Sequence, residues 1–164
     1  MRGTLLLRLV VAAAAAAALL LVVAPAKPTS RLDLPAATFA GVATGLLLYV
    51  AVARRRPYVP PRVPEAVAAC MVLVVAAGSE EVVWRQVVLG ELMRAGPLAA
   101  AAGSTLGFAL AHRTRQILHL GTGATFAGLY LATGALVAAI AAHWAYNVLL
   151  LTLAARSARQ EAPA

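Results

Sequence analysis

Charged and aromatic residues are scarce in this chain of 164 residues, and acidic residues are fewer still. Charged side chains make up 12% of the sequence and aromatic side chains 5%, whereas hydrophobic residues make up 62%. The mean hydropathy is +0.84. A soluble chain of this length cannot bury that much apolar surface in one small core. The composition therefore excludes an ordinary soluble domain and predicts a single membrane domain over residues 1–164, built from about six helical spans of roughly 20 residues each.

Cysteine is nearly absent, and negative charge is outweighed by positive charge. The single cysteine, Cys70, has no partner for an internal disulfide, and we expect it to pack as a small hydrophobe in its apolar run. Fourteen Lys and Arg residues against six Asp and Glu residues give a net charge of +8. The arginines lie between apolar stretches and form no basic run interleaved with aromatics. They indicate membrane topology and contact with anionic lipid headgroups, so no nucleic-acid partner is expected.

The apolar stretches predict an all-α fold, a polytopic transmembrane helical bundle. The expected spans are about 5–24, 36–53, 65–92, 97–112, 116–131 and 135–154. With six spans, most basic residues fall on one side: Arg2, Arg54, Arg55, Arg56, Arg62, Arg113, Arg115, Arg156 and Arg159. The opposite side holds only Lys27, Arg31 and Arg94, offset by Asp33 and Glu91. The excess of positive charge predicts that both termini face the cytoplasm.

Two features of the spans have alternative interpretations. The first stretch resembles a secretory signal peptide, with small residues at 24–26, but its length favours an uncleaved span. Either interpretation leaves the later topology unchanged. Gly41 and Gly45, and likewise Gly103 and Gly107, are spaced four apart on one helix face, which predicts close helix packing.

Three ionisable residues lie within one predicted span, far from its ends: Glu80, Glu81 and Arg85. A charge at the bilayer centre costs at least about 2.5–3.5 kcal/mol on insertion scales, so such residues need partners. The spacing of Glu81 and Arg85 predicts an ion pair along one helix face. Glu80 lies about 100° further round the helix and has no partner within its own segment.

Two other spans carry polar residues in a pattern. Phe108 and His112 lie one turn apart on one helix face, and so do His143 and Asn147 on another. His119 has no patterned polar neighbour, and we expect it to be a packing or interfacial residue.

Together these residues resemble the intramembrane proteases of the CAAX-protease and bacteriocin-processing (CPBP, or Abi) family. Residues 80–85, Glu-Glu-Val-Val-Trp-Arg, fit the family motif EExxxR. Residues 108–112 fit the motif FxxxH, and residues 143–147 fit the motif HxxxN. Each motif occurs once, in the family's order, and the similar region covers about 65–153.

The resemblance implies a glutamate-type protease that needs no cofactor. Glu80 and His112 would activate a water molecule, and His143 and Asn147 would form an oxyanion hole. Glu81 and Arg85 would brace the helix, and Phe108 would pack beside the site. The resemblance further implies a protein or peptide substrate in the bilayer of a bacterial inner membrane. Relatives act near the carboxyl ends of prenylated proteins, on bacteriocins or on sorting anchors, and a myxosortase-like role in trimming such anchors is one of these.

Two alternatives remain open at this point. Glu80, His112 and His143 could instead hold a catalytic zinc ion, although the sequence contains no HExxH motif. The chain could also be a non-catalytic membrane protein that confers immunity, binds a partner or relays protons.

The predicted depths of the site residues also conflict. At about 1.5 Å per residue, Glu80 lies about 24 Å from Pro64, and His112 lies about 24 Å from Gly96, on the opposite side. Upright helices would place the two side chains at different depths. A joint site therefore requires tilted helices or a fourth span that begins below the membrane surface.

Overall fold

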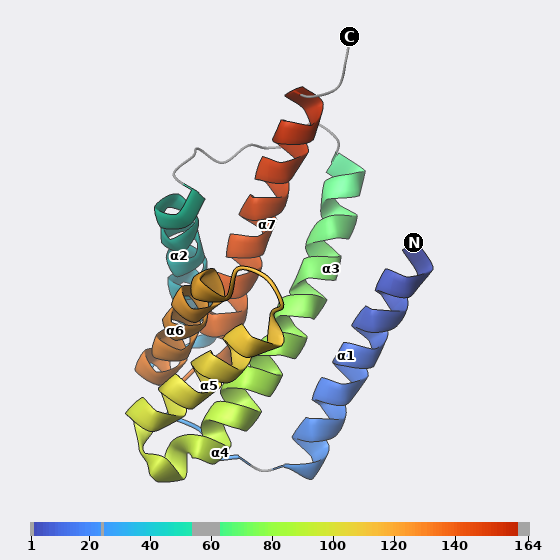
Figure 1. Ribbon diagram of the computed structural model, residues 1–164. Helices are drawn as coiled ribbons and strands as arrows, with labels where there is room; N and C mark the ends of the chain where they lie inside the picture. Colours follow the sequence, from blue (N-terminus) through green and yellow to red (C-terminus); the bar gives the residue numbers. More distant parts are fainter. Residues whose placement is uncertain (1, 24, 54–62, 161–164) are drawn as a thin grey trace.

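The computed structural model describes the backbone of residues 2–23, 25–53 and 63–160, and this part of the chain is helical with no strand. Its helices form six rods that run alternately up and down the bundle (Figure 1). The elements are α1 Arg2–Val22, α2 Leu34–Ala53, α3 Val63–Glu81, η1 Val82–Leu89, α4 Gly90–Leu92, η2 Met93–Ala95, α5 Pro97–Ala111, α6 Gln116–Thr133 and α7 Leu136–Gln160. The all-α fold predicted from the sequence is confirmed.

Two helical segments among the described residues are long and apolar enough to cross a membrane by themselves. They are Leu34–Ala53 and Val67–Ala95. Among the residues whose side chains are described, three shorter apolar stretches of 10–17 residues are Val10–Val22, Pro97–Ala111 and Leu136–Leu151. The outer face of α2 exposes large apolar side chains, among them Phe39 and Leu47, which are 75% and 70% exposed. Such a face suits contact with lipid and is costly in water.

One unbroken rod forms from α3, η1, α4 and η2, which follow one another without a gap from Val63 to Ala95. Residues 82–89 of this rod are a π-helix, which begins directly after Glu81. Segments of π-helix are rare and are frequently found at functional sites. Gly96 ends the rod with φ 96°, a conformation that glycine adopts without strain, and Pro97 begins α5.

This long rod removes the conflict between the predicted depths of Glu80 and His112. Glu80 lies sixteen residues before Gly96, and His112 lies sixteen residues after it. Because the chain reverses direction at Gly96, both side chains lie about 24 Å from the same turn. The sequence allowed for tilted helices or a fourth span that begins below the membrane surface, and the length of this rod accounts for the joint site without either. Helix α5 is short, and it ends about half way along the bundle (Figure 1).

Three connections lie at one end of the bundle: the α1–α2 connection, the turn from η2 into α5, and the α6–α7 turn (Figure 1). The backbone N–H of Arg31 donates to the carbonyl oxygen of Thr133 at 2.8 Å, which ties the α1–α2 connection to the α6–α7 turn. Gly90 packs against Pro25 and Ala26 of the same connection. Lys27, Arg31 and Arg94 therefore lie at this end of the bundle. Arg54, Arg55, Arg56 and Arg62, which belong to the opposite side of that prediction, lie outside the described residues.

Glycines allow α2 to pack closely on α7. A Cβ atom at Gly41 would meet the carbonyl oxygen of Ala138, and one at Gly45 would meet that of Ala142. In α5, Gly103 faces the side chain of Leu92, and Gly107 faces the ring of Trp84. Both glycine pairs therefore serve helix packing, as the sequence predicts.

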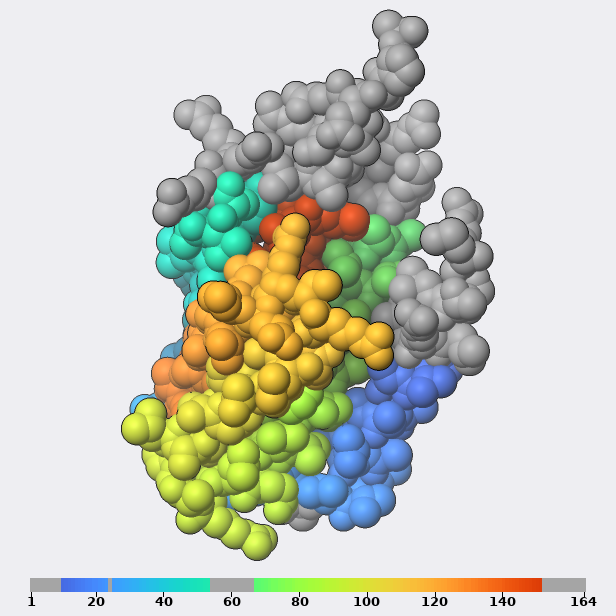
Figure 2. Space-filling model, viewed as in Figure 1, coloured from blue at the N-terminus to red at the C-terminus, as the bar shows by residue number. Residues whose placement is uncertain are grey.

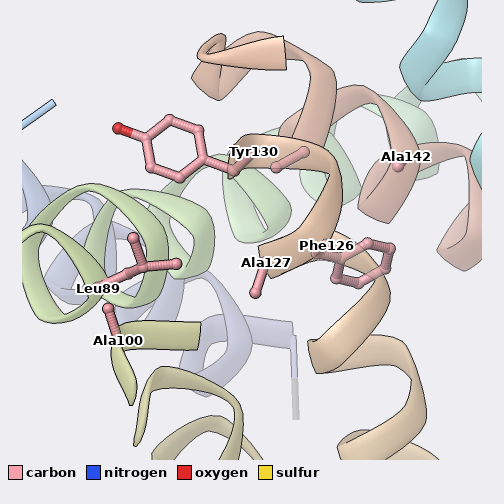
Figure 3. Packing of buried hydrophobic residues seen from close by; sticks show 7 residues of the cluster. Leu89, Ala100, Phe126, Ala127, Tyr130 and Ala142 are labelled. Carbon is pink, nitrogen blue, oxygen red and sulfur yellow. The ribbon is translucent and has the colours of Figure 1, made fainter. Parts of the chain in front are cut away.

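A cluster of buried residues joins η1, α5, α6 and α7 (Figure 3). It consists of Leu89, Ala100, Phe126, Ala127, Tyr130, Ala139 and Ala142. In the space-filling view, α5 and α6 cover the middle of one face of the bundle, between α2 and α1 (Figure 2). The cluster therefore fixes α5 and α6 against η1 and α7.

Candidate active site

The three polar motifs come together where α3 passes into η1. Glu80 and Glu81 are the last residues of α3, Arg85 lies in η1, His112 follows the end of α5, and His143 lies in α7. Glu81 and Arg85 are fully buried, and His143 is 7% exposed at its side chain. The structure thus brings residues from three separate rods into one site.

Glu81 is the centre of the buried part of the site. Its Oε2 accepts a hydrogen bond from Arg85 Nε at 3.0 Å, which is the ion pair predicted from their spacing. Its Oε1 lies 2.8 Å from Nδ1 of His143. Glu81 therefore does more than brace its own helix, because it also fixes the ring of His143 across the gap to α7.

Arg85 connects this centre to α5. Its Nη1 donates a hydrogen bond to Ser104 Oγ at 2.7 Å, and the Ser104 hydroxyl donates in turn to the carbonyl oxygen of Trp84 at 2.6 Å. The guanidinium carbon lies 5.3 Å from the centre of the Phe108 ring, within range of a cation–π interaction. Three elements, α3, η1 and α5, are thus held together by one buried cation.

Glu80 faces both histidines without bonding to either. Its Oε2 lies 3.8 Å from Nε2 of His112 and 3.9 Å from Nε2 of His143. This oxygen is buried and has no hydrogen-bond partner among the described residues, although 39% of the Glu80 side chain is exposed. A buried carboxylate oxygen without a partner is costly, unless a water molecule or a ligand completes its hydrogen bonding.

His112 is held from two directions. Its Nδ1 lies 2.7 Å from the carbonyl oxygen of Phe108, and its ring centre lies 4.5 Å from the Phe108 ring centre. The ring of His119, from the first turns of α6, is stacked on His112 with a centre-to-centre distance of 3.9 Å and an angle of 24°. Because the side chain of His112 is 29% exposed, the site reaches the surface at the α5–α6 turn.

His143 is set by its surroundings as well as by Glu81. Its ring stacks on Phe126 at 4.8 Å and meets Phe108 edge to face at 6.0 Å. Asn147 lies one turn further along α7 and is partly buried. No hydrogen bond of its side chain to another described residue is found.

Sequence reasoning missed three contributions to this site. The bond between Glu81 and His143 joins residues 62 positions apart, and no local pattern indicates it. Ser104 lies one turn before Phe108 on the same helix face, which was an available signal for a polar partner of Arg85. His119 was expected to be a packing or interfacial residue, yet its ring lies directly on His112.

One comparison with known proteins gave a match. The family model described as type II CAAX prenyl endopeptidase Rce1-like matches residues 62–149, which is 88 of 164 residues and includes all three motifs. No curated protein and no solved structure matches the chain. The chain belongs to the Rce1-like family of type II CAAX prenyl endopeptidases, a family of membrane-embedded proteases.

Proposed function

We propose that this protease cleaves a peptide bond with a water molecule held between Glu80, His112 and His143. The observation that carries the proposal is the unpartnered Oε2 of Glu80, which lies 3.8 and 3.9 Å from two imidazole nitrogens. These separations are too long for direct hydrogen bonds, and a bridging water would satisfy all three groups. The same carboxylate can then take a proton from that water as a general base.

The hydrogen bond of His112 defines which of its nitrogens is free. A carbonyl oxygen only accepts hydrogen bonds, so Nδ1 of His112 donates its proton to the oxygen of Phe108. In the neutral ring, Nε2 then carries the lone pair that points toward Glu80. His112 is therefore suited to hold the water with Glu80 and to accept a proton during the reaction.

The same reasoning gives His143 a different role. Glu81 is paired with Arg85 and accepts hydrogen bonds, so Nδ1 of His143 is the donor in their contact. For the proposed oxyanion hole, Nε2 must carry a proton as well, which makes His143 an imidazolium beside the carboxylates of Glu80 and Glu81. Nε2 would donate to the water before substrate binds and then, with the amide of Asn147, to the carbonyl oxygen of the bound substrate.

In the proposed reaction, Glu80 removes a proton as the water oxygen attacks the carbonyl carbon of the substrate. The negative charge that develops on the carbonyl oxygen is accepted by His143 and Asn147. The carbon–nitrogen bond then breaks, and the amine leaves with a proton returned from Glu80 or His112. Every proton taken from water is thus accounted for by a group in the site.

We propose that the substrate is the carboxyl-terminal region of a membrane-anchored or secreted bacterial protein, as the family implies. The enzyme would lie in the bacterial inner membrane with six spans and both termini in the cytoplasm. Because α5 ends half way along the bundle, the site would open toward the side that holds the termini. A trimming role of the myxosortase type is one form of this function.

The substrate proposal is tested by comparing membrane and secreted proteins from cells with and without the gene. A substrate should keep its longer carboxyl-terminal region in the deletion strain, and mass spectrometry should locate the cleavage site in the wild type. Incubation of that substrate with the purified enzyme should reproduce the cut. If the cleaved bond lies near the amino terminus, or if purified enzyme does not cut, the substrate proposal is wrong.

The zinc alternative uses the same three side chains, Glu80, His112 and His143. Among the described residues, no group of three or more histidine, cysteine, aspartate or glutamate side chains is arranged to hold a metal ion. Elemental analysis of active enzyme decides the question: stoichiometric zinc, with activity lost on chelation and restored by zinc, would establish a metalloprotease.

A further inference from the structure

We infer that His119 is a positioning residue, whose stacked ring holds the imidazole of His112 in the orientation that faces Glu80. His119 lies outside all three family motifs, and its position is set by α6, which belongs to a different rod from His112. The inference rests on the proposed role of His112 in holding the water, and it adds a residue on which that role depends.

His112 needs such support because of where it lies in the chain. It follows the last residue of α5 and has an extended backbone conformation, with φ −95° and ψ 113°. It is therefore outside the regular helix that would otherwise restrict its side chain. Its own hydrogen bond, from Nδ1 to the Phe108 carbonyl oxygen, fixes the position of Nδ1. This bond alone does not prevent the imidazole ring from rotating about Nδ1.

The ring of His119 prevents this rotation of the His112 ring. It lies 3.9 Å from the centre of the His112 ring and is inclined by only 24°, so it covers one face of the imidazole. Phe108 meets the same two rings from another direction, 4.5 Å from His112 and 5.8 Å from His119. The three rings therefore pack mutually, and a swing of His112 toward His119 is blocked.

His119 is itself firmly placed. Its backbone N–H donates to the carbonyl oxygen of Arg115 at 3.1 Å, and its own carbonyl accepts from the Thr122 hydroxyl at 3.4 Å. Arg115 has φ 55°, and this left-handed residue reverses the chain so that α6 returns beside α5. The α5–α6 turn thus brings together two rings that are seven residues apart in the sequence.

Stacked rings present their faces to each other, so their nitrogens cannot exchange a proton directly. The role of His119 is consequently one of geometry, and another flat ring should perform it. This distinguishes His119 from His112 and His143, whose nitrogens face Glu80.

The test compares H119A and H119F with the wild type in a peptide-cleavage assay of the purified, full-length enzyme. For H119A we expect kcat to fall about 3- to 10-fold with KM unchanged, the size of effect carried by one aromatic pair. H119F should keep kcat within about 2-fold, because phenylalanine retains the stacked surface. I117A is the matched control, since Ile117 lies in the same turn of α6 and is 87% exposed.

Wild-type kcat in H119A, or a loss in H119F as large as that in H119A, would overturn the inference. Thermal unfolding in detergent identifies a variant that fails to fold, and if H119A does so, H119L replaces it as the non-planar side chain. E80Q in the same assay separates the two proposals. If E80Q is inactive and H119A is unaffected, only the role of His119 is wrong, whereas an active E80Q refutes the proposed mechanism itself.

Discussion

Replacing Arg85 with alanine removes the guanidinium that joins Glu81 to Ser104 in the buried part of the site. The guanidinium is fully buried, and it donates to Glu81 at 3.0 Å and to Ser104 at 2.7 Å. It also lies 5.3 Å from the centre of the Phe108 ring. R85A therefore deprives a buried carboxylate of its counter-charge and deprives a buried hydroxyl of its donor.

The size of the effect follows from what Glu81 retains. Removing one partner of a buried ion pair typically destabilises a protein by about 3–5 kcal/mol. In R85A, Glu81 keeps its contact of 2.8 Å with His143, which partly replaces the lost partner of the carboxylate. We therefore expect the free energy of unfolding to fall by about 3 kcal/mol. R85K keeps the charge but lacks the planar fork that reaches Glu81 and Ser104 together, and we expect its free energy of unfolding to fall by about 1.5 kcal/mol.

The assay is thermal unfolding of purified protein in detergent, followed by two independent probes. R94A is the matched control, because Arg94 is an exposed arginine in the turn before α5 and should leave the midpoint unchanged. A wild-type midpoint for R85A would refute the reasoning, since it would mean that the pair contributes nothing to the folded state. A strong dependence of the difference on salt would also refute it, because buried pairs are screened little.

Three further predictions concern packing and topology. G45A should lower stability by about 1–3 kcal/mol, because its Cβ would meet the Ala142 carbonyl oxygen, whereas G128A faces open space and should be tolerated. Thermal unfolding of the two variants checks this, and equal midpoints would contradict it. Y49F should leave the midpoint unchanged or raise it, because the buried Tyr49 hydroxyl has no hydrogen-bond partner within the described residues, and a lower midpoint would reveal one. S30C in a C70S background should react with an impermeant maleimide from outside the cytoplasm, and labelling from the cytoplasmic side would overturn the topology.

The helices and the residues of the site were predictable because each leaves a local signal. Apolar stretches indicate the rods, and Pro97 and Gly134 mark a beginning and an end that the structure shows. Charged and polar side chains inside such stretches are costly, and this singled out Glu80, Glu81, Arg85 and the patterned histidines. Most of these side chains lie together in one site because buried polar groups need hydrogen-bond partners.

The rest of the site depends on contacts that no local pattern encodes. An apolar sequence gives the same signal in an α-helix and in a π-helix, so the π segment at 82–89 could not be recognised. The arginines of the α5–α6 turn indicate a membrane surface, yet the turn lies half way along the bundle (Figure 1). The positions of Ser104 and His119 follow from that turn, because it sets how far α5 and α6 extend beside η1.

The measurement that tests the mechanism most directly is the turnover of purified E80Q beside that of the wild type, on the same substrate. Glutamine keeps the shape of glutamate but cannot accept a proton from water, so kcat should fall about 10²–10⁴-fold. Because Oε2 of Glu80 makes no hydrogen bond to another described residue, the unfolding midpoint should stay at the wild-type value. A folded E80Q enzyme that cleaves within about 10-fold of the wild-type rate would contradict the assignment of Glu80 as the base.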